Sequence, residues 1–137
     1  MVLGPEFPID RPKRPGTWEI VARSKKISEQ WIEYVNQANS QCQSVYDQLS
    51  THPLFEDGDR QQRLAGEISR GIFEGEAYER RQIDITSGGR VWYFVDQTPF
   101  GSGQKKRNGR VIIDAIFMGH PKDTEKKQSG KRRPGRK

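Results

Sequence analysis

The spacing of hydrophobic residues changes along this chain, and each spacing predicts an element of secondary structure. In residues 17–24 (TWEIVARS) apolar side chains alternate from Trp18 to Ala22, which predicts a first strand, and Ser24 can then cap a helix. Residues 27–49 place apolar side chains at steps of three and four, the period of an amphipathic helix. A polar stretch within this region leaves one long helix and two consecutive helices as open alternatives.

The second half of the chain predicts strands joined by short connections. Residues 51–59 hold a proline and an Asp-Gly pair, which end the helical region. Residues 60–77 contain three glycines, which predict an irregular crossing. Residues 78–85 (YERRQIDI) and 90–96 (RVWYFVD) flank the turn TSGG and predict a β-hairpin. Residues 110–119 are apolar on both faces, which indicates a final strand in the centre of the sheet.

This order predicts an α+β fold: an antiparallel-rich sheet of about four strands with an N-terminal helical pair packed on one face. Because side chains alternate along a strand, Ile83 and Ile85 should face the helices. The same strand then carries these side chains on the open face: Arg80, Gln82 and Asp84. The strand after the turn has one face with Val91, Tyr93 and Val95 and another with Arg90, Trp92 and Phe94. If the first of these sets is core, Arg90 lies beside aromatic rings on the open face.

The net charge of the chain indicates a class of binding partner. The 137 residues include 24 Lys and Arg against 18 Asp and Glu, a net charge of +6 that favours polyanions such as nucleic acid. Residues 126–137 alone hold seven of the basic residues and no acid, so the rest of the chain is close to neutral. A polyanion site on the body must therefore be local. We expect a flexible leader at 1–16, its first residues open to a cloning origin, a single domain at 17–124 and a disordered basic tail at 125–137.

Several classes of protein are disfavoured by composition. The single cysteine, Cys42, excludes an internal disulfide, and two histidines make a zinc cluster implausible. No apolar run approaches the length of a membrane span, and the N-terminus lacks a signal-peptide pattern. We therefore expect a soluble, cytoplasmic protein with no metal and no cofactor.

The order of elements resembles that of the RelE/ParE superfamily of bacterial type II toxins. The resemblance rests on the helical pair after a short first strand, on the strand-turn-strand QIDITSGGRVWYFVD, and on the closing VIIDAIFMGHPK. It covers residues 18–124 and implies a RelE-like microbial RNase fold. It also implies a toxin that is neutralised by a cognate antitoxin protein. In the RelE-like branch such a toxin is a ribosome-dependent endoribonuclease (mRNA interferase) that cuts mRNA and inhibits translation.

That reaction resembles other metal-free RNA cleavages, in which the ribose 2′-OH attacks the adjacent phosphate and leaves a cyclic phosphate. It requires a proton acceptor, cations for the transition state and an acid for the leaving oxygen. The resemblance assigns a phosphate contact to Arg90, which opens the strand after the turn and whose guanidinium can hold two oxygens. An ion pair with Asp84 across the hairpin is the structural alternative for this arginine.

The segment GHPK after the last strand supplies two further candidates. The resemblance places an active-site cation or proton donor at His120 and Lys122. A histidine with a pKa near 6.5 can act as acid or base at physiological pH. The alternative is a solvent-facing histidine in a loop.

The chain departs from the family where two lysines flank the scissile phosphate on the strand before the turn. Gln82 and Asp84 occupy those positions. Arg80 and Arg81 are the only local substitutes for the missing charge, and strand alternation favours Arg80 as the catalytic cation. This departure shifts weight toward a mechanism centred on histidine.

Other residues are candidates for RNA contact without catalysis. They are Arg81, Trp92, Lys105, Lys106 and Arg107. Trp92 could stack on a base, although packing beneath a terminal segment is the commoner role for such a ring. The lysines and Arg107 form a basic loop, which a solvated surface loop would explain as well.

Two other functions remain open at this stage. A ParE-like toxin would poison DNA gyrase by protein contact, and the absence of the two lysines favours it. A non-catalytic RNA-binding or ribosome-binding protein would depend on the basic loop and tail. The first alternative predicts activity on gyrase, and the second predicts binding that is lost with residues 126–137.

Overall fold

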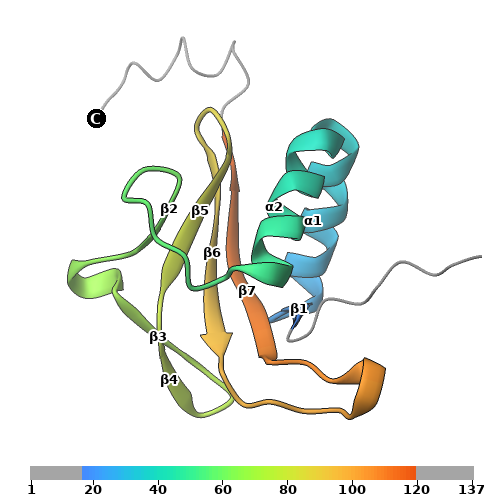
Figure 1. The fold of residues 1–137 in the computed structure, drawn as a ribbon. Coiled ribbons are helices and arrows are strands. Elements are labelled where there is room, and N and C mark those ends of the chain that lie inside the picture. Colours follow the sequence, from blue (N-terminus) through green and yellow to red (C-terminus); the bar gives the residue numbers. More distant parts are fainter. Residues whose placement is uncertain (1–16, 120–137) are drawn as a thin grey trace, which may run out of the picture.

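The computed structural model describes residues 17–119 (Figure 1). Its elements, in chain order, are β1 (Trp18–Ala22), α1 (Lys25–Gln37), α2 (Asn39–Thr51), β2 (Gln61–Arg63), β3 (Arg70–Phe73), β4 (Glu76–Glu79), β5 (Arg81–Thr86), β6 (Gly89–Asp96) and β7 (Gly109–Met118). Two short 3-10 turns lie at Gly66–Ile68 and Gly103–Lys105.

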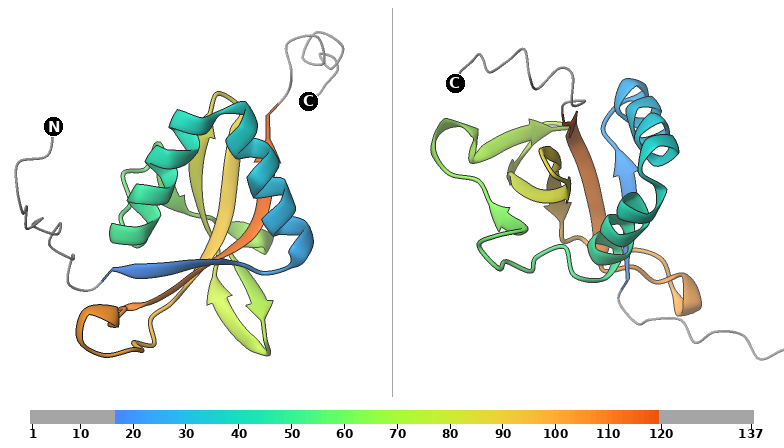
Figure 2. Two further views of the ribbon diagram at one scale, coloured as in Figure 1. Left: turned by 90° about the vertical axis from the view of Figure 1, so that its right-hand side faces the viewer. Right: turned by 90° about the horizontal axis from the view of Figure 1, so that it is seen from above.

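The main sheet has five strands in the order β1-β7-β6-β5-β2. β1 runs parallel to β7, and the other neighbours are antiparallel. Both helices cover one face of this sheet, and the β3–β4 hairpin lies on the other side (Figures 1 and 2). The expected α+β class is confirmed, and β7 lies inside the sheet as predicted. The main sheet has one strand more than expected, and the β3–β4 hairpin is additional.

The helical region consists of two helices that separate at Ala38. Its backbone leaves the helical conformation at φ −146°, while its N–H still donates to the Tyr34 carbonyl oxygen. At the start of α1, Ser24 Oγ accepts a hydrogen bond from the Ile27 N–H (3.2 Å), so the predicted cap is confirmed. Neither helix in residues 17–119 is long and apolar enough to cross a membrane.

The core lies between the helices and the sheet. The helices contribute Tyr34, Cys42, Val45 and Leu49, and the sheet contributes Ile83, Ile85, Val91, Tyr93, Val111, Ile113 and Ile116. The predicted alternation in the hairpin is therefore correct. At the turn, Tyr34 Oη lies 2.7 Å from Thr86 Oγ1, directly under Gly89, where any side chain would collide with it. The β5–β6 turn is thus fixed to the helical layer.

The segment 60–77 differs from the expected irregular crossing. It forms β2, β3 and the first half of β4, and Phe73 pairs with Glu76 across a two-residue turn. Both turn residues, Glu74 and Gly75, have positive φ, as tight hairpin turns require. The predicted strand 78–85 is also two strands, because the chain crosses from the small hairpin into the main sheet at Arg80.

Candidate nucleic-acid interface on the open sheet face

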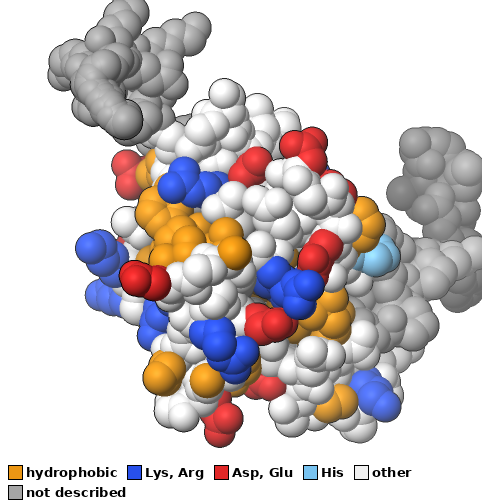
Figure 3. Space-filling model, turned by 90° about the vertical axis from the view of Figure 1, so that its left-hand side faces the viewer, with side chains coloured by type: hydrophobic (Ala, Val, Ile, Leu, Met, Phe, Trp, Pro, Cys, Tyr) orange, Lys and Arg blue, Asp and Glu red, His pale blue; other side chains and the backbone are white. Residues whose placement is uncertain are grey.

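The sheet face opposite the helices has a covered end and an open end. The β3–β4 hairpin covers the end that holds Phe94, whose ring is fully buried and stacks on Tyr78 with centroids 5.5 Å apart. Gly71 of β3 passes directly over this ring, because a Cβ there would lie 2.7 Å from Phe94 Cζ. Within residues 17–119 the end near the β5–β6 turn carries no such cover, and hydrophobic side chains are exposed there beside Lys or Arg side chains (Figure 3).

A buried carboxylate anchors the covered end. The side chain of Asp114 is only 6% exposed, and it pairs with Arg23 and with Arg80 Nε (2.9 Å). Arg80 also donates to the carbonyl oxygens of Ile68 (3.0 Å) and Arg70 (3.1 Å). Arg23 in turn donates to the Ile72 carbonyl oxygen (3.0 Å). These bonds fasten the β3–β4 region to the sheet.

This placement changes the interpretation of Arg80. It does lie on the open face, as alternation predicts, and its guanidinium sits 5.4 Å from the ring centroids of Trp92 and Phe94. However, its side chain is 16% exposed and is held by an ion pair with Asp114. We therefore treat Arg80 as a structural cation and not as a free catalytic one.

Arg90 is the central cation of the open end. It is partly exposed, and its guanidinium lies 4.5 Å from the centroid of the Phe117 ring. Phe117 in turn meets Trp92 edge to face, with centroids 4.8 Å apart. Among the partly or fully buried arginines of residues 17–119, only Arg90 has neither an ion pair nor a hydrogen bond. No residue of 17–119 therefore neutralises the Arg90 charge through an ion pair.

Gln82 and Asp84, which stand where the resemblance to RelE-like toxins would place two lysines, lie beside Arg90. Trp92 Nε1 donates to Gln82 Oε1 (2.9 Å), and Gln82 Nε2 lies 3.5 Å from Asp84 Oδ1. Asp84 faces Arg90 directly in the β5–β6 register. Burial raises the pKa of the Asp84 carboxyl above its usual value, and the nearby Arg90 charge opposes that shift.

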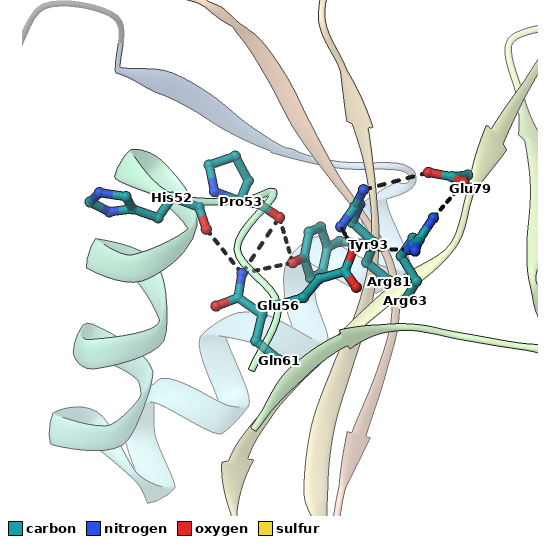
Figure 4. Close-up of polar contacts among 8 residues, drawn as sticks. All are labelled: His52, Pro53, Glu56, Gln61, Arg63, Glu79, Arg81 and Tyr93. Atoms are coloured by element: carbon teal, nitrogen blue, oxygen red, sulfur yellow. Dashed lines mark hydrogen bonds and ion pairs between the residues drawn. The ribbon is translucent and has the colours of Figure 1, made fainter. Parts of the chain in front are cut away.

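Arg81 points to the other side of the sheet. It is 8% exposed and pairs with Glu56 (3.3 Å) and Glu79 (3.5 Å), and Arg63 pairs with the same two carboxylates (Figure 4). The expected RNA contact by Arg81 does not agree with this position, because its charge is enclosed and already matched. We leave it out of the interface.

A polar network beside Arg81 supports the hairpin from the helix side. Gln61 Nε2 donates to the His52 carbonyl oxygen (3.0 Å) and to Tyr93 Oη (2.9 Å), and Tyr93 Oη donates to the Pro53 carbonyl oxygen (2.7 Å; Figure 4). Burial raises the pKa of Tyr93 to about 12. This network connects the end of α2 to the middle of β6, so the strand that carries Arg90 is held on both faces.

The basic loop lies at the far end of the sheet from Arg90. β6 and β7 pair from Gly89–Met118 at one end to Asp96–Arg110 at the other, and the loop follows Asp96 (Figure 1). Its three basic side chains are exposed or partly exposed: Lys105, Lys106 and Arg107. They do not join the open end described above. His120 and Lys122 lie outside the described residues.

The sequence did not reveal the ion-pair cluster around Asp114 at the covered end. Asp114 was part of an apolar strand pattern, and its partners Arg23 and Arg80 are distant in the chain, so only the fold reveals the cluster. A charged residue inside an otherwise apolar strand was the available signal. Among the described residues, no group of three or more His, Cys, Asp or Glu side chains could hold a metal ion.

Comparison with known proteins gives no independent assignment. The chain matches no family model, and no curated protein or solved structure is significantly similar to it.

Proposed function

We propose that this protein is the toxin of a type II toxin–antitoxin system and cleaves mRNA on the ribosome, by attack of the ribose 2′-OH on the adjacent phosphate. The observation that carries the proposal is the guanidinium of Arg90, which forms no ion pair within residues 17–119 and lies beside an aromatic pair on a sheet face that no described element covers. A phosphate on Arg90 would place a neighbouring base within reach of Trp92.

The order of elements also supports the proposal. A helical pair follows the first strand, the β5–β6 hairpin carries Arg90, and β7 closes the sheet, which is the order on which the resemblance to RelE/ParE toxins rests. The β2–β4 region is an addition between the helices and the hairpin. Because Arg80 is neutralised, we assign the phosphate contact to Arg90 and keep His120 and Lys122 as proton-transfer and charge candidates.

A ParE-like gyrase poison is the second candidate. It is favoured by the same neutralisation of Arg80 and by Gln82 and Asp84 at the lysine positions, since these leave fewer cations for a phosphorane-like transition state. The third alternative, a non-catalytic RNA-binding protein, would use the exposed lysines of the basic loop.

Two activity assays on the full chain separate these functions. We expect cleavage of a reporter mRNA on translating ribosomes and no inhibition of supercoiling by DNA gyrase. Arg90→Ala should abolish most cleavage, and in cells expressed without antitoxin it should relieve growth arrest, as should His120→Ala. Gyrase inhibition without cleavage would support the ParE-like alternative instead. RNA binding without cleavage, lost on removal of 126–137, would support the non-catalytic one.

A matched control keeps the charge change constant. Arg70 of β3 is exposed, and no ion pair or hydrogen bond of its side chain is present among residues 17–119. Arg70→Ala removes the same charge from another surface and should leave cleavage within about twofold of the unmodified protein. Equal loss in both variants would indicate a nonspecific charge effect and would refute the assignment of Arg90.

A further inference from the structure

We propose that Asp84 is the group that takes the proton from the attacking 2′-OH, with Gln82 as its positioning residue. This inference rests on the proposed RNA cleavage and names its base. The position is one where the resemblance would place a lysine, so the assignment comes from the geometry of this chain.

The register of the β5–β6 hairpin brings Asp84 next to Arg90. Asp84 and Arg90 are directly opposite on neighbouring strands and share the open face. Side chains in such pairs have Cβ atoms about 4.5–5.5 Å apart. A phosphate held by Arg90 would therefore bring the adjacent ribose over the Asp84 carboxylate.

The charges of Asp84 and Arg90 do not pair with each other. Among the described residues no ion pair joins these two side chains, although they are cross-strand neighbours. Arg90 instead lies over the Phe117 ring. Within residues 17–119 the Asp84 carboxylate accepts one long contact, from Gln82 Nε2 to Oδ1 (3.5 Å), so Oδ2 is able to accept a proton.

Hydrogen bonds hold the backbone of Asp84 and the side chain of its neighbour Gln82 in place. Asp84 N–H donates to the Arg60 carbonyl oxygen (2.9 Å), and Arg60 Nε donates to the Asp84 carbonyl oxygen (3.2 Å). Trp92 Nε1 holds Gln82 Oε1 (2.9 Å), which turns the Gln82 NH₂ group toward Asp84. A base held in this way needs little reorganisation before proton transfer.

The charged groups near Asp84 suit this role. They are Arg90 on β6 and, in the loop before β2, Asp57, Asp59 and Arg60. Burial is the largest influence and raises the pKa of the carboxyl, and the two acidic neighbours raise it further, while the two arginines lower it. A carboxylate with a raised pKa is a stronger base near neutral pH.

The step balances with the groups named. The 2′-OH proton passes to Asp84, and the 2′-oxygen forms a bond to phosphorus while Arg90 holds a non-bridging oxygen. The P–O5′ bond then breaks with its electron pair on O5′, which takes a proton from water or from His120, the acid candidate of the proposed function. The products are a 2′,3′-cyclic phosphate and a 5′-hydroxyl end.

The test compares full-length Asp84→Asn with the unmodified protein on ribosome-bound mRNA. Asn keeps the shape and the contact with Gln82 but cannot take the proton, so cleavage should fall by about 10²–10⁴-fold. RNA binding should change by less than about threefold. The control is Asp47→Asn on the exposed surface of α2, which should cleave like the unmodified protein.

Two further readouts separate a base from a structural residue. The rise of the cleavage rate with pH on the acid side should disappear in Asp84→Asn. A substrate whose leaving 5′-oxygen is replaced by sulfur needs no acid, and it should not restore cleavage by Asp84→Asn, because the base is still absent. Unchanged cleavage by Asp84→Asn, or its rescue by the sulfur substrate, would overturn the assignment. Failure of the unmodified protein to cleave any mRNA would instead refute the proposed function.

Discussion

The two ends of the open sheet face are built from the same kinds of residue, but within residues 17–119 only one of them is covered by another element. At the covered end Arg80 meets Asp114 beneath the β3–β4 hairpin, and at the open end Arg90 faces Asp84 with no hairpin above it. Both arginines lie against aromatic rings. The difference is that the Asp114 carboxylate pairs with two guanidinium groups, whereas the Asp84 carboxylate forms no ion pair within residues 17–119. The presence of an arginine near an aspartate on a sheet therefore does not by itself define its role. Its ion-pair partners and the elements that cover it determine whether it stabilises the fold or can bind a ligand.

The largest expected effect comes from breaking the covered end. Asp114→Asn removes the charge that two guanidinium groups share, and loss of one partner of a buried pair costs about 3–5 kcal/mol. Because Arg23 is partly exposed, we expect a loss near 3 kcal/mol in the free energy of unfolding, measured by urea denaturation. A loss below about 0.5 kcal/mol would show that the cluster does not anchor the hairpin.

The next effect is the converse result at the open end. Arg90→Ala should lower mRNA cleavage by about 100–1,000-fold, the usual effect of removing one group that stabilises transition-state charge. Its unfolding free energy should change by no more than about 1 kcal/mol, since within residues 17–119 the guanidinium lies over the Phe117 ring and forms no ion pair. The same two assays applied to Arg90→Ala and Asp114→Asn would test the comparison. If Arg90→Ala lowers the free energy of unfolding by several kcal/mol and leaves cleavage unchanged, Arg90 is a structural residue and the assignment of the two ends is reversed.

A smaller effect is expected at Trp92. Trp92→Ala should reduce affinity for single-stranded RNA by about 1–3 kcal/mol if the ring stacks on a base. Trp92→Phe keeps a ring but loses the hydrogen bond to Gln82, so it should retain most affinity and lose cleavage. Fluorescence titration with a short RNA measures both variants, and equal affinities for Trp, Phe and Ala at this position would exclude stacking.

The smallest effect is on stability at Asp84. Its folded-state pKa is raised, so the folded protein binds the proton more tightly than the unfolded chain, and stability is lost as pH rises through that pKa. Asp84→Asn should therefore be slightly more stable than the unmodified protein at pH 7, by no more than about 0.5 kcal/mol, with the gain vanishing well below pH 4. A stability loss at pH 7 would mean that the carboxylate is structurally required.

The open end could be predicted from sequence because its determinants are local. Alternation within QIDITSGGRVWYFVD fixes which side chains share a face. The pairing of Asp84 with Arg90 also depends on a register shift between Asp84 and Thr86, which the turn sequence does not predict. Ser24 and the strand before it were likewise readable from neighbouring residues. The confirmed parts of the fold are of this kind.

The covered end could not be predicted because it depends on long-range pairing. Asp114 meets Arg23 across 91 residues of sequence and Arg80 across 34. The glycines in 60–77 suggested an irregular path, but Gly71 is there because β3 passes directly over Phe94, and Gly75 because a tight turn needs positive φ. Glycine occurs both in irregular segments and in strands and turns that require it, and only the packing of the folded protein distinguishes the two cases.

The most direct test of the central claim is an NMR titration of arginine side chains with a short single-stranded RNA that cannot be cleaved, having 2′-deoxyribose at each position of attack. We expect the Arg90 guanidinium and the Trp92 indole signals to shift on binding, while those of Arg23 and Arg80 stay in place because Asp114 holds them. Shifts confined to the 105–107 loop, or equal shifts at Arg80 and Arg90, would contradict the claim that the open end is the binding site.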